Sequence, residues 1–332
     1  MSAEKIISDW KTGVFKPVYW LEGDEPYFID KVMDYAEHRI LSEGEAGFNL
    51  TTFYGRDAEW TAVVNACRRY PMFAERQVVL LKEAQHMKDL EKLEGYVSKP
   101  LPTTVLIVAH KEKKYDGRTN LAKALKKNAE QFLSKKLFDN QLPEWTRAMV
   151  QSKGYDITSQ ALQLLIDNIG NDLNRLENEV EKVWLNLGNS KTIDENAIEK
   201  YVGISKEFNA FELQAAIGKK DLAKAIRIIQ YFEANPKAAP IQLILPAIYS
   251  YFSKVYSILG MDDKSENGVK GLFSNNFYAA KDGLAAAKIF GIQGIEKILL
   301  LLHEYNLRSI GIHDSGTSDA DLLKEMVVKM VS

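Results

Sequence analysis

The feature that most constrains the fold is a series of short apolar or β-branched segments in the first part of the chain. The predicted strands are Val18–Leu21, Asn49–Tyr54, Val78–Leu81 and Val105–Ala109. Each segment is too short for a stable helix, and longer stretches with helical periodicity separate them. Runs of this kind are typical of parallel strands that helices cover on both faces. They predict an α/β domain at the start of the chain.

Helix signals occupy the intervals between these strands. Glu25-Pro26 opens an amphipathic stretch that runs to Ile40, and proline at a first helical position is a common start signal. Further helices are predicted at Trp60–Arg69 and Leu121–Asn128, and a fifth strand at Gln131–Leu133. The alternation of strands and helices predicts a doubly wound parallel sheet.

From about residue 141 the character of the sequence changes, because strand signals vanish and helical periodicity takes over. Three segments predict a small three-helix unit: Ser159–Asn168, Leu173–Leu187 and Asp194–Val202. The remaining predicted helices are Phe211–Ile217, Asp221–Ala234, Ile241–Leu259, Phe277–Lys288, Gly291–Arg308 and Asp319–Val331. These changes predict domains at residues 1–140, 141–206 and 207–332.

The balance of charge excludes a strongly basic or acidic protein, since 43 Lys and Arg face 45 Asp and Glu. A net charge of −2 gives no overall field that would draw the chain to nucleic acid or membrane. The one cysteine, Cys67, cannot form an internal disulfide, and we expect it to be a buried apolar residue. No segment resembles a signal peptide or is long enough to span a bilayer, so we expect a cytoplasmic location and no membrane partner.

The sequence lacks the motifs of nucleotide hydrolysis. A phosphate-binding loop, G-x-x-x-x-G-K-[ST], would follow the first strand, but that position holds Gly23-Asp24-Glu25-Pro26. The lysine and the hydroxyl are missing, and the two carboxylates would repel a phosphate. The five histidines are scattered, and none pairs with Cys, Asp or Glu at metal-ligand spacing. The sequence therefore predicts a non-enzyme without catalytic residues, metal site or cofactor.

A proline-containing junction, Tyr70–Gln77, separates the predicted helix Trp60–Arg69 from the next strand. Proline cannot donate a backbone hydrogen bond and disfavours helix in the residue before it, which places Met72 and Phe73 on a loop. They are either core residues at the strand entrance or an apolar plug that binds a partner. Taken alone, the composition of the loop favours the core.

Positive charge gathers between residues 111 and 136, where nine basic residues face three acidic ones. A solvated face is the usual meaning of such lysines, and contact with a phosphate backbone or a partner is the alternative. The candidate contact residues are Lys111, Lys113, Lys114, Arg118, Lys123, Lys126 and Lys127.

Several segments, through their order and spacing, carry a resemblance to a known family. They are Tyr19–Tyr27, Phe53-Tyr54-Gly55, Pro71–Val79, Leu173–Lys182, Asn209–Leu213, Ala215-Ala216-Ile217 and Lys224-Ala225. Through them the whole chain resembles the delta subunit of the bacterial DNA polymerase III clamp loader. The resemblance implies an AAA+-type, ATPase-like α/β domain with a degenerate nucleotide site, a three-helix lid at 141–206 and a helical collar for oligomerisation at 207–332.

The resemblance also implies a function in DNA replication. Delta subunits bind the ring-shaped sliding clamp, the beta subunit, and hold one interface open for loading onto primed DNA while motor subunits use ATP. The clamp contact would be Met72 and Phe73, with Pro71 shaping the loop, which favours the plug over the core.

Other implied partners are the tau/gamma ATPase subunits and delta-prime, with primer–template DNA reached through the complex. The chain itself would be non-catalytic within the DNA polymerase III holoenzyme, a DNA-directed DNA polymerase and nucleotidyltransferase.

Three alternatives stay open. An ATP-driven remodelling ATPase with an unconventional nucleotide loop would be supported by nucleotide binding to the isolated chain. The delta-prime type of subunit usually carries zinc-binding cysteines and a Ser-Arg-Cys motif, which this sequence lacks. A plain DNA-binding module rests only on the basic cluster between residues 111 and 136.

Overall fold

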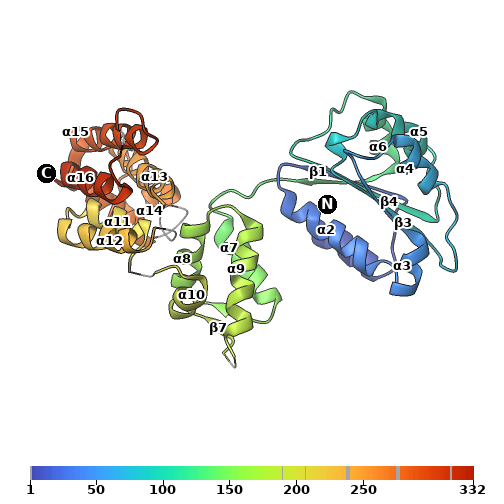
Figure 1. Cartoon of the computed structure of the whole chain (residues 1–332), viewed down its shortest axis with the longest axis horizontal. Helices are drawn as coiled ribbons and strands as arrows, with labels where there is room; N and C mark the ends of the chain where they lie inside the picture. The colour runs from blue at the N-terminus through green and yellow to red at the C-terminus, as the bar shows by residue number, and fades with distance from the viewer. Residues whose placement is uncertain (1, 189, 206, 237–239, 274–276, 315) are drawn as a thin grey trace. The chain divides into compact units, whose positions relative to one another are not determined.

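The chain forms two compact units, Met1–Leu137 and Phe138–Ser332, in a computed structural model (Figure 1). The structure describes residues 2–188, 190–205, 207–236, 240–273, 277–314 and 316–332. The first unit contains a sheet with helices on both of its faces, and the second is almost entirely helical. The predicted combination of an α/β part and an all-α part is confirmed.

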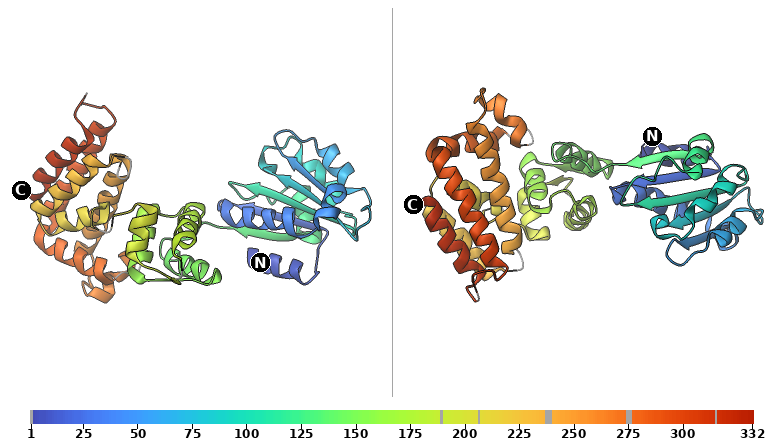
Figure 2. Two further views of the ribbon diagram at one scale, coloured as in Figure 1. Left: turned by 60° about the horizontal axis from the view of Figure 1, so that its bottom comes forward. Right: turned by 90° about the horizontal axis from the view of Figure 1, so that it is seen from above.

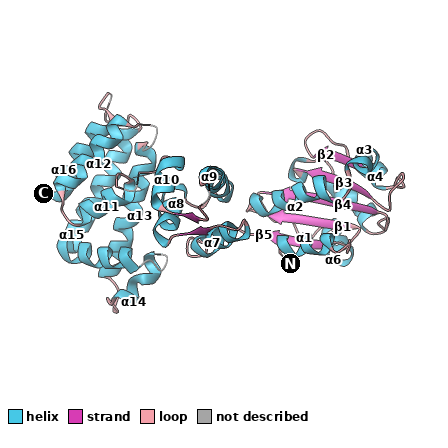
Figure 3. Ribbon diagram, turned by 90° about the horizontal axis from the view of Figure 1, so that it is seen from below, coloured by secondary structure: helices cyan, strands magenta, loops and turns pink. Residues whose placement is uncertain are grey.

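The sheet of the first unit has five strands in the order β2-β3-β4-β1-β5 (Figure 3). All neighbouring strands pair in parallel. The strands are β1 (Val18–Gly23), β2 (Leu50–Tyr54), β3 (Gln77–Lys82), β4 (Thr104–Lys111) and β5 (Glu130–Ser134). Each of the five predicted strands overlaps one of them, so the predicted doubly wound sheet is confirmed.

Helices cover both faces of this sheet. They are α1 (Ala3–Lys11), α2 (Pro26–Arg39), α3 (Glu43–Asn49), α4 (Trp60–Cys67), α5 (Glu94–Val97) and α6 (Asn120–Asn128), with short 3₁₀ turns at Ala84–His86 and Leu90–Leu93. Leu80 faces the core with α1 and α2, whereas its neighbour Leu81 faces the core with α4, α5 and α6. Figure 2 shows α1 and α2 together on one face. Alternate strand residues thus point to opposite faces and both faces are buried, which explains the continuous apolar runs.

The first half of the second unit differs from the prediction. Among its described residues four helices, not three, lie between residues 141 and 206: α7 (Leu142–Ser152), α8 (Ser159–Ile169), α9 (Leu173–Asn186) and α10 (Glu195–Val202). Strand structure also does not vanish, because β6 (Asp156–Ile157) and β7 (Thr192–Ile193) pair in parallel. The predicted division into a lid at 141–206 and a collar at 207–332 stays a prediction, as does the boundary at residue 140.

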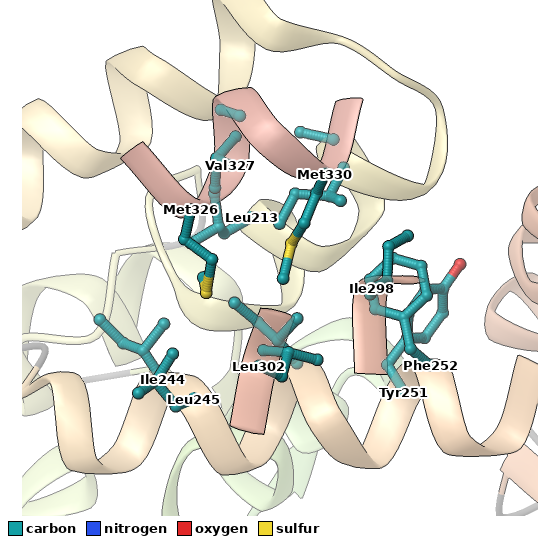
Figure 4. Packing of buried hydrophobic residues seen from close by; sticks show 14 of the residues in the cluster. Leu213, Ile244, Leu245, Tyr251, Phe252, Ile298, Leu302, Met326, Val327 and Met330 are labelled. Carbon is teal, nitrogen blue, oxygen red and sulfur yellow. The ribbon is translucent and has the colours of Figure 1, made fainter. Parts of the chain in front are cut away.

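The remaining elements are all helical. They are α11 (Ala210–Gly218), α12 (Leu222–Ala234), α13 (Ile241–Leu259), α14 (Glu266–Val269), a 3₁₀ turn at Lys270–Phe273, α15 (Phe277–Ser309) and α16 (Asp319–Val331). Gly291 interrupts α15 with a φ of 61°, at the break that the sequence predicts. Figure 4 shows Met326 and Met330 of α16 pointing toward α13 and Leu302 of α15. Flexible thioethers suit such irregular spaces between helices.

Within the described residues, no helix has the length and apolar character needed to cross a bilayer.

Candidate functional site

The junction between α4 and β3 forms an exposed loop, residues 68–76, here called the apolar loop. The helix before it ends at Cys67, two residues earlier than predicted. Phe73 is 93% exposed and Met72 is 52% exposed, while Pro71 is half-buried. Met72 and Phe73 are therefore not core residues, although the composition of the loop alone favours that interpretation. Single exposed apolar residues are common on soluble proteins, but several of them close together mark a candidate interaction site.

A buried asparagine at the end of α3 holds the backbone of this loop. Asn49 is 3% exposed, and its side-chain amide nitrogen donates to the carbonyl oxygen of Met72 at 2.8 Å. Its side-chain oxygen accepts from the backbone N–H of Met72 at 2.7 Å. The same amide nitrogen also donates to the carbonyl oxygen of Glu45 at 3.0 Å, which ties the asparagine to its own helix. The loop is thus fixed at the residue before Phe73.

The two ends of the apolar loop are held by other contacts. The buried amide nitrogen of Gln77 donates to the carbonyl oxygen of Ala66 at 3.1 Å and to Thr104 Oγ1 at 2.8 Å. Thr104 Oγ1 in turn donates to the carbonyl oxygen of Cys67 at 2.8 Å. These bonds satisfy carbonyl groups that the end of α4 leaves without helical partners. On the far side of the loop, the Arg76 guanidinium lies 4.0 Å from the centre of the Phe15 ring.

The backbone of Phe73 adopts an unusual conformation, with a φ of +56°. The left-handed region costs a residue with a side chain about 1–2 kcal/mol, and such residues gather where a side chain must be aimed. The combination of a strained backbone and a fully presented phenyl ring indicates a functional loop.

Two further exposed aromatic residues lie near Met72 and Phe73 in the chain or in space. Tyr70 belongs to the apolar loop and is 74% exposed, and Phe48, which directly precedes Asn49, is 67% exposed. The sequence analysis missed Phe48 as a candidate, because the helix that carries it was not predicted. The sequence did contain a signal that Phe48 is exposed. Phe48 lies between Gly47 and Asn49 and has no apolar partner at helical spacing within that segment.

At the position expected for a phosphate loop, a carboxylate of the protein itself takes the place of a phosphate. Gly23-Asp24-Glu25-Pro26 leads from β1 into α2, and the buried carboxylate of Glu25 accepts from the backbone N–H of Tyr27 at 3.0 Å. A helix N-terminus is the usual site for a phosphate, because its N–H groups lack partners. Here a fixed carboxylate takes that position, which disfavours an anion.

The carboxyl ends of the central strands are filled by ion pairs. Lys82 at the end of β3 lies 2.6 Å from Glu37, and Lys111 at the end of β4 lies 2.5 Å from Asp30, both acids belonging to α2. These residues line a cavity of about 240 Å³. Ligands of parallel α/β folds bind at this edge of the sheet. Both lysines are already paired with carboxylates there.

Other candidate chemistry is not supported among the described residues. Burial raises the pKa of the Cys67 thiol to about 12, which excludes a thiolate nucleophile at neutral pH and confirms the expected buried role. Burial also lowers the pKa of His110, which packs against Trp20. No group of three or more His, Cys, Asp or Glu in the described part of the chain could hold a metal ion.

The structure separates the seven basic candidates into two sets. Lys111 is paired with Asp30, and Arg118 donates to both carboxylate oxygens of Asp116, which lowers the pKa of that acid to about 2. The other five are exposed, and no carboxylate in the described residues lies within ion-pair distance of them: Lys113, Lys114, Lys123, Lys126 and Lys127. The last three share α6, whose Leu121 and Leu125 face the core.

The fold is shared with a solved structure. A Bacillus subtilis DNA clamp loader delta protein matches it with a TM-score of 0.62 and 20% sequence identity over 99% of each chain. This likeness confirms the predicted combination of an α/β part and a helical part.

Comparison of sequences finds matches to one family. Residues 19–135 match the family described as "DNA polymerase III, delta subunit". The chain is 24% identical to the DNA polymerase III subunit delta of Bacillus subtilis, over 97% of this chain and 95% of the relative. It is 23% identical to a protein of Aquifex aeolicus named "Probable DNA polymerase III subunit delta", over 82% and 81% of the two chains. The resemblance to DNA polymerase III delta subunits, predicted from the sequence, is confirmed by these matches.

Proposed function

We propose that this delta subunit acts in DNA replication by binding a ring-shaped sliding clamp and holding one of its interfaces open for loading onto primed DNA. The apolar loop makes the contact, with Met72 and Phe73 as the inserted side chains and Pro71 as part of its frame. The observation that carries the proposal is that Phe73 is 93% exposed, on a loop whose backbone is held by the buried side chain of Asn49.

The magnitude of the contact is adequate for a specific complex. Fully burying a large apolar side chain contributes about 1.5–3 kcal/mol, so two such side chains contribute several kcal/mol. Aromatic and Met side chains are also enriched among the few residues that dominate interface energy. Because the loop is held before binding, little conformational entropy is lost when it docks. Phe48 and Tyr70 would add apolar area at the edge of the contact.

The chain supplies no ATP chemistry of its own in this proposal. The carboxylate of Glu25 caps α2 where a phosphate would bind, and Lys82 and Lys111 are paired with acids at the strand ends. The energy of loading would then come from partner subunits, the tau/gamma ATPases, with delta-prime completing the assembly. Exposed apolar residues of α13 and α15 suit such subunit contacts, among them Leu243, Ile292 and Leu300.

A contact with the DNA backbone is a separate proposal. Five exposed lysines, three of them on α6, have no carboxylate partner among the described residues and can approach phosphates without reading sequence. Primer–template DNA would be met within the assembled loader rather than by the chain alone, because the net charge of the chain is −2.

The proposal is tested by binding of the full chain to the sliding clamp of the same organism. We expect the double variant Met72→Ala/Phe73→Ala to bind at least about 100-fold more weakly than the wild type, since it removes several kcal/mol of apolar contact. Phe138→Ala is the matched control, because Phe138 is 75% exposed but lies in the other unit. Circular dichroism checks that all three proteins fold.

Equal binding by the wild type and the double variant would move the contact away from the apolar loop. If the wild type does not bind the clamp at micromolar concentration, the proposed function is wrong. Nucleotide binding by the isolated chain would instead support the alternative of a remodelling ATPase.

A further inference from the structure

We propose that Asn49 is a positioning residue, which holds the apolar loop in the shape that presents Met72 and Phe73 to the clamp. This inference rests on the proposed function. Asn49 is not itself part of the binding surface, because only 3% of its surface is exposed.

The middle of the apolar loop depends on Asn49 for its backbone hydrogen bonds. Within the described residues, the backbone groups of residues 70–75 make no hydrogen bonds except the two that join Met72 to Asn49. Gln77 and Arg76 fix the ends of the loop, but they leave its middle unconstrained. Removing the Asn49 side chain would therefore release the segment that carries the exposed side chains.

The Asn49 amide also matches the loop chemically. The N–H and C=O of Met72 need an acceptor and a donor side by side, and a side-chain amide carries both. An aspartate in this place would keep the acceptor but turn a second oxygen toward the carbonyl oxygens of Met72 and Glu45. A leucine of similar size would leave buried polar groups unsatisfied.

The anchor leaves the binding surface free. The hydrogen bonds between Asn49 and Met72 use only the backbone of Met72, so the exposed side chains of Met72 and Phe73 stay available for a partner. The asparagine is itself fixed through Glu45, whose carboxylate accepts from both the backbone N–H and the hydroxyl of Ser42 at the start of α3. A capped helix thus supports a residue 23 positions further along the chain.

Limited trypsin digestion tests the anchor without any partner. Arg69 and Arg76 lie near the two ends of the loop, and mass spectrometry of the fragments reports cleavage after each. We expect Asn49→Asp and Asn49→Leu to be cut there at least about tenfold faster than the wild type, because the loop loses two hydrogen bonds. Ser134→Ala is the matched control, since it removes one buried hydrogen bond, to the Glu25 carbonyl at 2.7 Å, on the opposite edge strand.

Clamp binding by the full chain tests the role in positioning. We expect each Asn49 variant to weaken binding about tenfold, and to have no further effect in the Met72→Ala/Phe73→Ala background. If Asn49 had only a general structural role, its substitution would weaken clamp binding equally in the wild type and in the Met72→Ala/Phe73→Ala variant. The Ser134→Ala control should bind like the wild type.

The outcomes separate the two proposals. Unchanged cleavage in both Asn49 variants would overturn the inference, and so would faster cleavage with unchanged clamp affinity. If the wild type itself fails to bind the clamp, the proposed function is overturned and the role of Asn49 in binding falls with it. The digestion then still decides whether Asn49 holds the loop.

Discussion

Gly23, at the end of β1, illustrates how one residue permits a close junction between two strands. Its φ is +135°, which residues with a Cβ rarely adopt. A Cβ there would lie 1.8 Å from the carbonyl oxygen of Ser134. The backbone of β5 thus approaches β1 closely at the point where a phosphate loop would need space. The glycine is visible in the sequence, but its close approach to Ser134 could be found only from the structure.

We predict that Gly23→Ala lowers the free energy of unfolding by about 2–4 kcal/mol, because it combines backbone strain with a clash against main chain. Urea unfolding followed by circular dichroism measures the change. Gly44→Ala is the control, since nothing lies within 4 Å of a Cβ at that helical position, and it should be neutral or slightly stabilising. An unchanged midpoint for Gly23→Ala would show that the junction is not as tight as described.

Residues of the candidate site differ in how well the sequence predicts them. Met72 and Phe73 could be placed on a loop because Pro71 excludes a continuing helix. Their exposure could not be predicted from composition, since the same residues suit a core. Asn49 was interpreted as a strand residue, and its role was hidden because Met72 lies far from it in sequence.

Helix α6 carries three of the lysines of the proposed DNA contact. Its apolar residues face the sheet, while Lys123, Lys126 and Lys127 are exposed. We predict that changing these three lysines to glutamine makes DNA binding by the assembled loader less dependent on salt. Each lost phosphate contact reduces the slope of log affinity against log salt concentration by about 0.9, so three contacts reduce it by about 2–3.

Fluorescence anisotropy with a primer–template duplex over a range of salt concentrations measures this slope. Lys16, Lys88 and Lys99 are exposed lysines of the same unit, and their change to glutamine is a charge-matched control that should leave the slope unchanged. A slope that does not differ between the two triple variants would assign the α6 lysines to the solvated face that such residues usually form.

The helices that the sequence analysis missed fall into two kinds. Helix α3 contains two glycines and buries only Asn49, so it has no apolar stripe that periodicity could detect. Helix α7 buries Leu142, Thr146, Met149 and Val150, a helical spacing that was present in the sequence. Helix α3 could not be predicted because it depends on tertiary contacts, whereas helix α7 could have been predicted from its apolar spacing.

At the scale of the whole molecule, the α/β unit carries the candidate clamp contact, and the helical unit carries exposed apolar residues that are candidates for subunit contacts. The strand pattern predicted the first unit well, because buried parallel strands leave a strong signal. The function could not be derived from fold alone, since one fold serves many activities. It required the resemblance in sequence together with the presentation of the apolar loop.

Release of a closed clamp from circular primed DNA tests the central claim most directly, because it measures opening rather than binding. The full-length wild-type chain, without nucleotide, is added to labelled clamp on the circle, and clamp retained on DNA is followed over time. We predict faster release with the wild type and with Phe138→Ala, and release at the spontaneous rate with Met72→Ala/Phe73→Ala. Equal release by the wild type and the double variant, or binding by the wild type without release, would contradict the account.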